Sequence, residues 1–267
     1  LEPLDDLWGY ATATVDEAVE LRKSGIKKPI LILGYTFPEC YEEIVRYDIR
    51  QTVFQLDMAK ALSEEAVRQN RKAYIHMKMD TGMGRIGYQT AKEAAEDAVK
   101  IKELPMLEME GVFTHFANAD TENPEFTLKQ IEKFNEMIKA MEAEGVTFAL
   151  KHCANSAGII EFADDKFNLV RSGIISYGLW PSDEVKRDVV QLKPILSLKS
   201  HVVYVKEGMF GPSNNQLIGY DIDKINRALM EEDRPYVLIG PGRWGSSDTW
   251  LGIPVKWPNI AGAKVIV

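Results

Sequence analysis

The sequence predicts an α/β protein: an incomplete (β/α)8 barrel followed by a small mixed α/β segment. Strand-like and helix-like segments alternate through about seven units before Pro181. The strands must be parallel, because a helix separates each one from the next. Residues 29–34 form a continuous apolar run, which suits a strand covered on both faces. The first strand-to-helix turn lacks the glycine-rich motif of an open doubly wound sheet. A closed barrel has eight units, so we expect one to be missing at the start.

Periodicity and capping residues define the elements. The expected strands are residues 8–14, 29–34, 51–56, 73–79, 107–116, 147–153 and a seventh that begins at residues 169–170. The expected helices are residues 15–24, 38–47, 57–70, 90–102, 126–145 and a short one that ends at Phe162. Thr14 and Glu17 predict a capping box at the start of the first helix, and Gly25 ends it.

Two helices have a clear apolar face. In the helix at residues 57–70 we expect the buried side chains to be Met58, Ala61, Leu62, Ala66 and Val67. In the helix at residues 126–145 we expect them to be Phe134, Met137, Ile138 and Met141. The alternation of predicted strands and helices ends near residues 182–192. We therefore expect a barrel over residues 1–190 and a C-terminal segment over residues 191–267, whose first part, residues 191–207, alternates as a strand.

Composition excludes several classes of protein. The chain has 267 residues, 45% of them hydrophobic and 27% charged, as is usual for a soluble globular protein. Its net charge of −8 argues against a general nucleic-acid or anionic-membrane binder. The two cysteines, Cys40 and Cys153, have no metal-ligand spacing and suit a reducing cytoplasm. We expect neither a signal peptide nor a transmembrane span.

Polar and small residues follow the predicted strands at their carboxyl ends, which share one rim in a parallel barrel. The candidates at this rim are Lys78, Asp80, Arg85, His115, Asn155, Ser156, Arg171, Gly173 and Ile174. The last two strands of such barrels, with their loops, commonly bind phosphate through backbone N–H groups. An aromatic phosphate ligand would also need a flat face, which His115 could supply, and a ring-nitrogen partner, which Arg171 could supply.

Several of these residues also have a purely structural interpretation. His115 could be an ordinary structural histidine, Arg171 an ion-pair partner and Ser156 a helix N-cap. We expect Asp80 to organise its turn through backbone bonds. We assign His76 and His152 to the core or to a supporting role, and Cys153 to the core as a small buried residue. Only the joint pattern favours a functional site.

Four segments occur in order on successive predicted strands: HMKMDTGMGRIGY, EGVFTHFANAD, HCANSAG and NLVRSGIISYGLWPS. Together they closely resemble alanine racemases, over residues 8 to about 206. The resemblance implies a (β/α)8 barrel that uses pyridoxal 5′-phosphate and is followed by a β domain, acting as a cytoplasmic homodimer. It also implies an isomerase that interconverts L- and D-alanine and so supplies cell-wall precursors.

The resemblance also implies roles for individual residues. Lys78 is similar to a lysine that the family often carbamylates, whose negative charge would hold Arg85. Arg85 resembles the arginine that reaches toward the cofactor's phenolic oxygen and the substrate carboxylate. His115 resembles the imidazole stacked by the pyridine ring, and Arg171 the arginine that faces the pyridine nitrogen. The implied phosphate-binding residues are Asn155, Ser156, Gly173 and Ile174.

Two groups that the family needs have no counterpart in the 267 residues. Racemisation requires a Schiff-base lysine on one face of the substrate and an opposing tyrosine on the other. No segment resembles VKANAYGHG, which bears the lysine, and the tyrosine-bearing loop is not found either. We therefore expect this chain alone to be inactive. The alternatives are a non-catalytic barrel that binds pyridoxal phosphate or phosphate, as in the pyridoxal-phosphate homeostasis proteins, and a truncated or chimeric fragment without a function of its own.

The end of the chain resembles a different group. The segments GMFGPSNNQLIGYDIDKIN and YVLIGPGRWGSSDTWLGIPVKW are similar to the tail of proteins with a PEP/pyruvate-binding domain of the pyruvate phosphate dikinase type. We therefore expect a chimeric chain, with the join at about residues 206–208.

Overall fold

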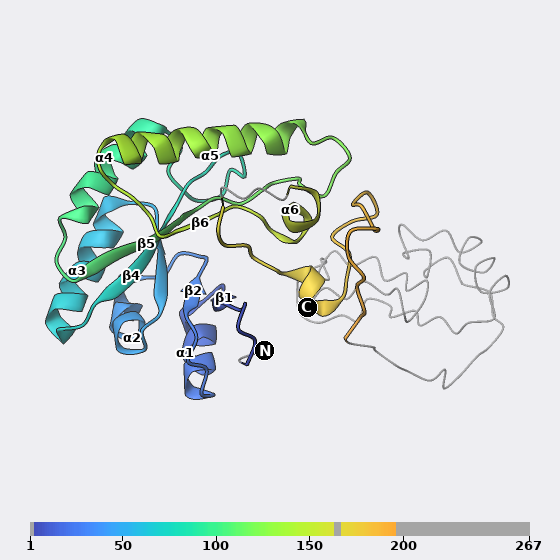
Figure 1. The fold of residues 1–267 in the computed structure, drawn as a ribbon. Coiled ribbons are helices and arrows are strands. Elements are labelled where there is room, and N and C mark those ends of the chain that lie inside the picture. Colours follow the sequence, from blue (N-terminus) through green and yellow to red (C-terminus); the bar gives the residue numbers. More distant parts are fainter. Residues whose placement is uncertain (1–2, 163–166, 196–267) are drawn as a thin grey trace, which may run out of the picture. The chain divides into compact units, whose positions relative to one another are not determined.

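One parallel sheet organises the part of the chain that the structure describes. The computed structural model describes residues 3–162 and 167–195. The strands are β1 (Tyr10–Thr12), β2 (Ile30–Ile32), β3 (Arg50–Val53), β4 (Ala73–Lys78), β5 (Leu107–Phe113) and β6 (Leu150–His152). They pair in sequence order, and every pair is parallel. The sheet curls into part of a barrel, which confirms the expected incomplete (β/α)8 fold (Figure 1).

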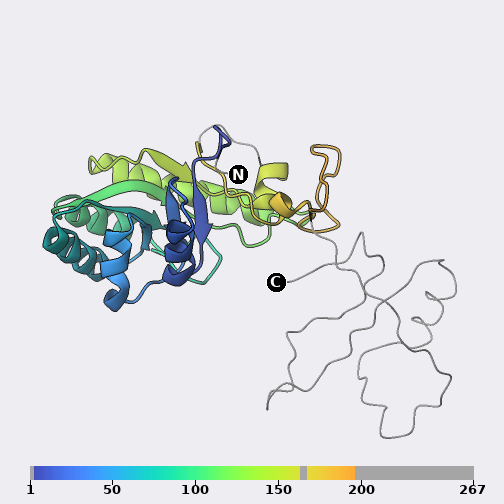
Figure 2. The ribbon, with the colours of Figure 1, turned by 90° about the horizontal axis from the view of Figure 1, so that it is seen from below.

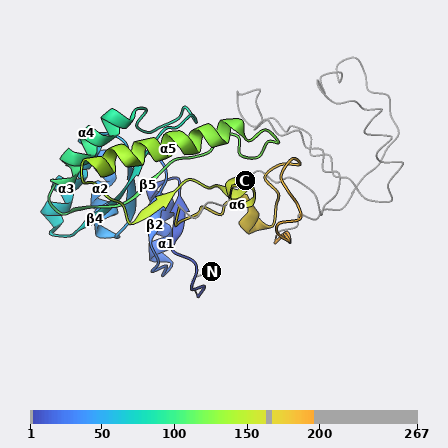
Figure 3. The ribbon, with the colours of Figure 1, turned by 45° about the horizontal axis from the view of Figure 1, so that its top comes forward.

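Helices connect the strands and cover the outside of the sheet. They are α1 (Val15–Lys23), α2 (Tyr41–Arg46), α3 (Leu56–Gln69), α4 (Ala91–Lys102), α5 (Glu125–Ala143) and α6 (Ser156–Glu161), with the 3-10 turns η1 (Pro38–Cys40) and η2 (Ile174–Tyr177). Helices α4 and α5 lie side by side (Figures 1 and 3). Seen from below, α1 stands beside β1 (Figure 2). None of the described helices is long and apolar enough to cross a membrane.

The chain divides into two units, Leu1–Leu192 and Lys193–Val267. The helices and strands given above all belong to the first unit. The strand expected at residues 191–207 lies largely outside the described residues, as does the segment at residues 208–267 that resembles a PEP/pyruvate-binding protein.

The capping box predicted for the first helix is confirmed. The side-chain oxygen of Thr14 accepts a hydrogen bond from the backbone N–H of Glu17 at 3.4 Å, and the Glu17 carboxylate accepts one from the N–H of Thr14 at 3.0 Å. Backbone N–H groups of Ala13 and Thr14 also hold the pKa of Glu17 below its usual value. Gly25 follows the helix with a φ of +93°, a conformation that favours glycine.

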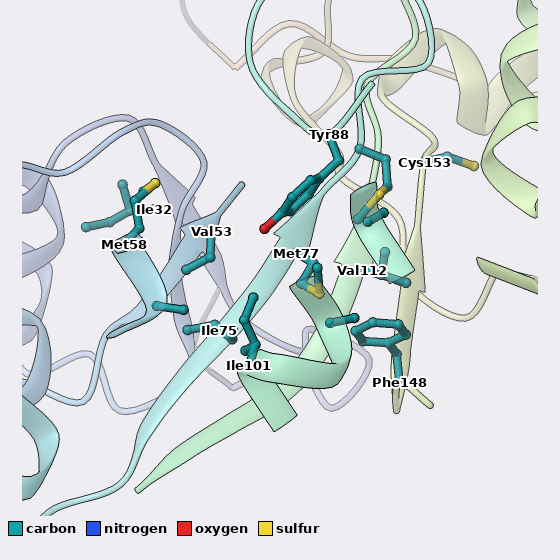
Figure 4. Packing of buried hydrophobic residues seen from close by; sticks show 14 of the residues in the cluster. Ile32, Val53, Met58, Ile75, Met77, Tyr88, Ile101, Val112, Phe148 and Cys153 are labelled. Atoms are coloured by element: carbon teal, nitrogen blue, oxygen red, sulfur yellow. The ribbon is translucent and has the colours of Figure 1, made fainter. Parts of the chain in front are cut away.

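The apolar layer lies between the outer face of the sheet and the helices (Figure 4). Its labelled side chains include Val53, Ile75, Met77 and Val112 from the strands and Met58 and Ile101 from the helices. The four side chains expected inside α5 are all buried. In α3, Met58, Leu62 and Ala66 are buried as expected, and Ala61 is half-buried. The prediction for Val67 is wrong, because Val67 is 49% exposed. Ala59 and Ser63 are buried in α3, and the Ser63 hydroxyl donates to the Pro105 carbonyl oxygen at 2.6 Å.

The seventh strand is not formed in the described residues. The segment that follows β6 still runs beside it, since the N–H of Asn168 donates to the Lys151 carbonyl at 3.1 Å and that of Arg171 to the Ala154 carbonyl at 2.9 Å. The Asn168 side chain replaces ladder bonds that a strand would make. Its amide donates to the Ala149 carbonyl at 2.7 Å and its oxygen accepts from the Lys151 N–H at 2.9 Å.

We expect Phe134→Ala to lower the free energy of unfolding by about 3–5 kcal/mol, because the ring is fully buried and its loss leaves a cavity. Leu128→Ala is the matched control, since Leu128 lies on the same helix and is 52% exposed. Urea unfolding followed by circular dichroism measures both. Equal stability of the two variants would contradict the packing described for α5.

Candidate active site at the carboxyl rim of the strands

Lys78 is the last residue of β4 and is buried. Its ammonium group donates to the carbonyl oxygens of Met79 at 2.6 Å and Ile86 at 3.2 Å. The pKa of Lys78 is lowered to about 8, mainly by burial; Asp80 opposes the shift, and the positive charges of Arg171 and Arg85 add to it. The amine is therefore partly unprotonated near neutral pH.

The loop after β4 is built around Asp80. One carboxylate oxygen accepts hydrogen bonds from the N–H groups of Gly82 and Gly84, each at 3.0 Å, which confirms the predicted turn-forming role. Gly82, Gly84 and Gly87 have the spacing of dinucleotide-binding glycines, and all have positive φ. The glycines do not open a helix, however: the chain first returns to an isolated bridge between Met79 and Tyr88, and α4 begins only at Ala91. The loop therefore positions Arg85, which is exposed, rather than a helix N-terminus.

Arg171 brings its guanidinium back over the ends of β5 and β6. It donates to the Thr114 carbonyl at 2.7 Å and the Cys153 carbonyl at 3.0 Å, and it contacts His152 Nδ1 at 2.7 Å and His115 Nδ1 at 3.4 Å. Burial lowers the pKa of Arg171 to about 10, so the group stays charged at neutral pH. Its Nε is buried and has no hydrogen-bond partner among the described residues.

His115 is neutral at this rim. Burial lowers the pKa of His115 to about 4, with further contributions from the charges of Arg171, Arg85 and Lys78. Because these charges change the pKa of His115 and of Lys78, the four predicted site residues must lie near one another. The structure therefore brings Lys78, Arg85, His115 and Arg171 to one part of the molecule, as the parallel arrangement predicts.

The four residues expected to bind phosphate also lie close together, but two of them differ from expectation. The Ser156 hydroxyl oxygen accepts from the N–H of Gly173 at 3.0 Å and of Ile175 at 3.4 Å. Asn155, not Ser156, caps α6, because its side-chain oxygen accepts from the Gly158 N–H at 3.0 Å. The Ile174 side chain is exposed.

Three buried residues that we did not predict hold two of the rim loops together. Gln130, on α5, donates to the Thr81 hydroxyl and to the His115 carbonyl, both at 3.1 Å, and accepts from the Ala117 N–H at 2.9 Å. The hydroxyls of Thr81 and Thr114 are 2.8 Å apart. A polar residue inside the apolar face of a predicted helix was the available signal for Gln130.

His76 and His152 are fully buried, as expected, and Cys153 is buried as well. Phe113 lies beneath the rim: its ring stacks on His152 with centroids 4.7 Å apart, and Lys78 Nζ and the Arg171 guanidinium lie 5.6 and 5.3 Å from its centroid. The inner face of the sheet is thus polar and aromatic, whereas the outer face is aliphatic and methionine-rich (Figure 4).

A curled parallel sheet with a cationic rim at its carboxyl ends places this chain among the (β/α)-barrel proteins. Comparison with known families then gives the narrower assignment. The profile described as the N-terminal domain of alanine racemase matches residues 4–181, and the chain belongs to this family.

Individual relatives agree with the family. An alanine racemase of Clostridium tetani strain Massachusetts / E88 is 43% identical over 196 residues, which cover 73% of this chain and 51% of the relative. The solved structure of alanine racemase from Clostridium difficile 630 in complex with cycloserine is 41% identical, with a TM-score of 0.71, and the match covers 74% of this chain and 55% of that one. The chain therefore spans about half the length of these relatives.

Lys78 should make stability depend on pH in a distinctive way. Its pKa is about 8 in the folded chain and 10.5 in a model peptide, so between these values the unfolded chain binds more protons and stability rises with pH. We expect Lys78→Met to remove a rise of up to about 3 kcal/mol between about pH 7.5 and about pH 10.5. Urea unfolding at several pH values measures it.

Lys72→Met is the control for this experiment, because Lys72 lies just before β4 and is exposed, paired with Glu108 at the surface. This variant should keep the rise. Parallel stability curves for the wild type and Lys78→Met would show that the buried amine keeps an ordinary pKa.

Proposed function

We propose that this chain binds pyridoxal 5′-phosphate at the carboxyl rim and forms the cofactor-binding part of an alanine racemase. The observation that carries the proposal is the buried Nε of Arg171, which has no hydrogen-bond partner in the part of the chain that the structure describes. A buried donor without an acceptor is costly, so its retention indicates a ligand with an acceptor atom. The unprotonated nitrogen of a pyridine ring is such an acceptor.

The charge of Arg171 suits this role. A guanidinium can only donate hydrogen bonds, so a ring nitrogen that accepts from it stays unprotonated. When bound, the cofactor supplies an electron sink for the substrate α-carbon, and an unprotonated ring makes that sink weaker. Side reactions of the carbanion are then disfavoured, which suits simple return of a proton.

The phosphate end is supported by the surroundings of Ser156. The backbone N–H groups of Gly173 and Ile175 both donate to its hydroxyl oxygen, so a phosphate oxygen beside that hydroxyl would lie where two backbone donors already converge. Gly173 has no side chain, which lets such an oxygen approach the backbone. The Asn155 side chain caps α6, so we assign it a supporting role in this site.

The remaining residues act through charge. Arg85 is exposed beside Lys78 and His115, where it can meet the carboxylate of an amino acid. The partly unprotonated amine of Lys78 is the form that reacts with carbon dioxide, and we propose that its carbamate would hold Arg85. His115 is neutral, so its ring offers a flat face without adding charge.

The substrate, the assembly and the setting follow the family. We propose alanine as the substrate, a homodimer as the active assembly, the cytoplasm as its location, and D-alanine supply to the cell wall as its purpose. The 267 residues contain no segment like those that bear the lysine and the tyrosine that move the α-proton. We therefore propose that this polypeptide, by itself, binds cofactor without racemising alanine.

Cofactor binding can be measured by titrating the chain with pyridoxal 5′-phosphate and following absorbance and protein fluorescence. We expect Arg171→Ala and Ser156→Ala each to weaken binding by about 10-fold or more, since each removes a hydrogen bond to a charged or acceptor group. Ser172→Ala is the control, because Ser172 is exposed and, within the described residues, its hydroxyl bonds the Ser176 hydroxyl of its own turn. No binding by the folded wild-type chain would refute the proposal.

Racemisation is tested with L-alanine and added cofactor, by following optical activity. We expect no measurable D-alanine, because the two proton-transfer groups are not present. Formation of D-alanine by the purified chain would overturn this expectation. Borohydride reduction and peptide mapping would then show whether Lys78 had attached the cofactor.

A further inference from the structure

A line of polar side chains crosses the inner face of the sheet and ends at Arg171. The Arg50 guanidinium contacts the Glu110 carboxylate at 3.2 Å, and the same carboxylate oxygen lies 3.1 Å from His76 Nε2. His76 Nδ1 lies 2.8 Å from His152 Nε2, and His152 Nδ1 lies 2.7 Å from Arg171 Nη1. The line joins three strands, β3, β5 and β4, to β6 and the segment after it.

The direction of every hydrogen bond in this line is determined. The Arg171 guanidinium can only donate, so His152 Nδ1 accepts and the proton of its neutral ring lies on Nε2. That proton is donated to His76 Nδ1, which leaves the His76 proton on Nε2, pointing at Glu110. Each ring accepts a hydrogen bond at Nδ1, so both rings are neutral in this arrangement, and burial lowers the pKa of both in the same direction. Each ring passes the polarisation from the guanidinium toward the carboxylate.

Two backbone features make the line possible. His76 and His152 belong to β4 and β6, and they meet across β5 because Gly111 has no side chain there. A Cβ at Gly111 would lie 2.5 Å from His76 Nδ1. The register of β4 and β5 shifts between Ile75 and His76, which pair with Met109 and Gly111, so Glu110 is the extra residue of a bulge. Bulges of this kind re-aim a side chain, here toward His76.

The positive charge of Arg171 has to be compensated by a carboxylate. In residues 3–162 and 167–195, no carboxylate forms a salt bridge with its buried guanidinium. A buried charge without compensation is costly. Glu110 is the carboxylate to which it is joined by hydrogen bonds, and Arg50 also binds Asp48, at 3.0 Å, near the surface.

We propose that Glu110 is a positioning residue: it accepts the proton that His76 carries on Nε2, and through His76 and His152 it holds the orientation of Arg171 that leaves Nε without a partner in the described part of the chain. The value of that orientation for cofactor binding rests on the proposed function. The proton positions do not, because they follow from contacts within this chain.

The proton positions can be measured without any cofactor. The chain has four histidines, so the nitrogen NMR spectrum of the chain labelled with 15N-histidine contains few ring signals. We expect the rings of His76 and His152 to carry their proton on Nε2 alone near neutral pH. A proton on Nδ1 of either ring, or a cationic ring, would overturn the proposal.

The variant Glu110→Gln tests the role of the carboxylate. An amide oxygen can still accept from the Nε2–H of His76, but it carries no charge, so this hydrogen bond is weaker. We expect the His76 proton to stay on Nε2, the ring-nitrogen signals of His76 to shift, and the Nε–H of Arg171 to exchange faster with water. Glu108→Gln is the matched control: it makes the same change on β5, at an exposed carboxylate that pairs with Lys72. Identical histidine signals in the two variants would overturn the proposal, and so would His76 and Arg171 signals in Glu110→Gln that match the wild type. If Glu110→Gln does not fold, acid titration of the folded wild type removes the same charge from the carboxylate, whose pKa its partners His76 and Arg50 hold below its usual value. His76 signals that stay unchanged through that titration would overturn the proposal.

A second arm addresses the cofactor. We expect Glu110→Gln to weaken binding of pyridoxal 5′-phosphate by about 10-fold, the size typical of a lost outer partner, and Glu108→Gln to leave it unchanged. If the wild type does not bind the cofactor, the proposed function fails while the tautomer result stands. If the wild type binds it and both variants bind equally, the link from Glu110 to the site fails.

Discussion

The burial of one guanidinium governs the arrangement of this half-barrel. Arg171 lies in the segment after β6. Its guanidinium donates to carbonyl oxygens at the ends of β5 and β6, contacts the imidazole of His152 and lies over the ring of Phe113. Each of these partners lies where it does because strands β4 to β6 are parallel and adjacent. The charge could not be buried in a sheet with another strand order, since its partners would then lie on different edges.

The sheet also separates an apolar layer on its outer face from polar side chains on its inner face. The outer face of β4 packs Ile75 and Met77 against helices, and its inner face carries His76 and Lys78. Alternation along a strand thus gives the same six residues an apolar side that stabilises the fold and a polar side that holds charge. The lowered pKa values of Lys78 and His115 follow from this placement, because both groups are buried and both lie near the positive charge of Arg171.

The sequence was sufficient for the features that depend on local patterns. Alternation predicted the parallel sheet, Thr14 and Glu17 predicted the capping box, and the strand ends predicted which residues meet at the rim. Features that depend on two segments at once were not predicted. The bulge at Glu110 arises from the pairing of β5 with β4, and the hydrogen bonds of Asn168 replace a ladder that periodicity alone would have placed there. The glycine inside the β5 pattern was a signal for the bulge.

Gln130 has a mechanical consequence for the rim. One amide on α5 is bonded to the loop after β4 and to the loop after β5, and Lys133, one turn further along, donates to the Asp80 carbonyl at 3.1 Å. Both loops are therefore hydrogen-bonded to the same helix, α5. A small slide or rotation of α5 would move the loops that bear Arg85 and His115 together and keep the spacing between them.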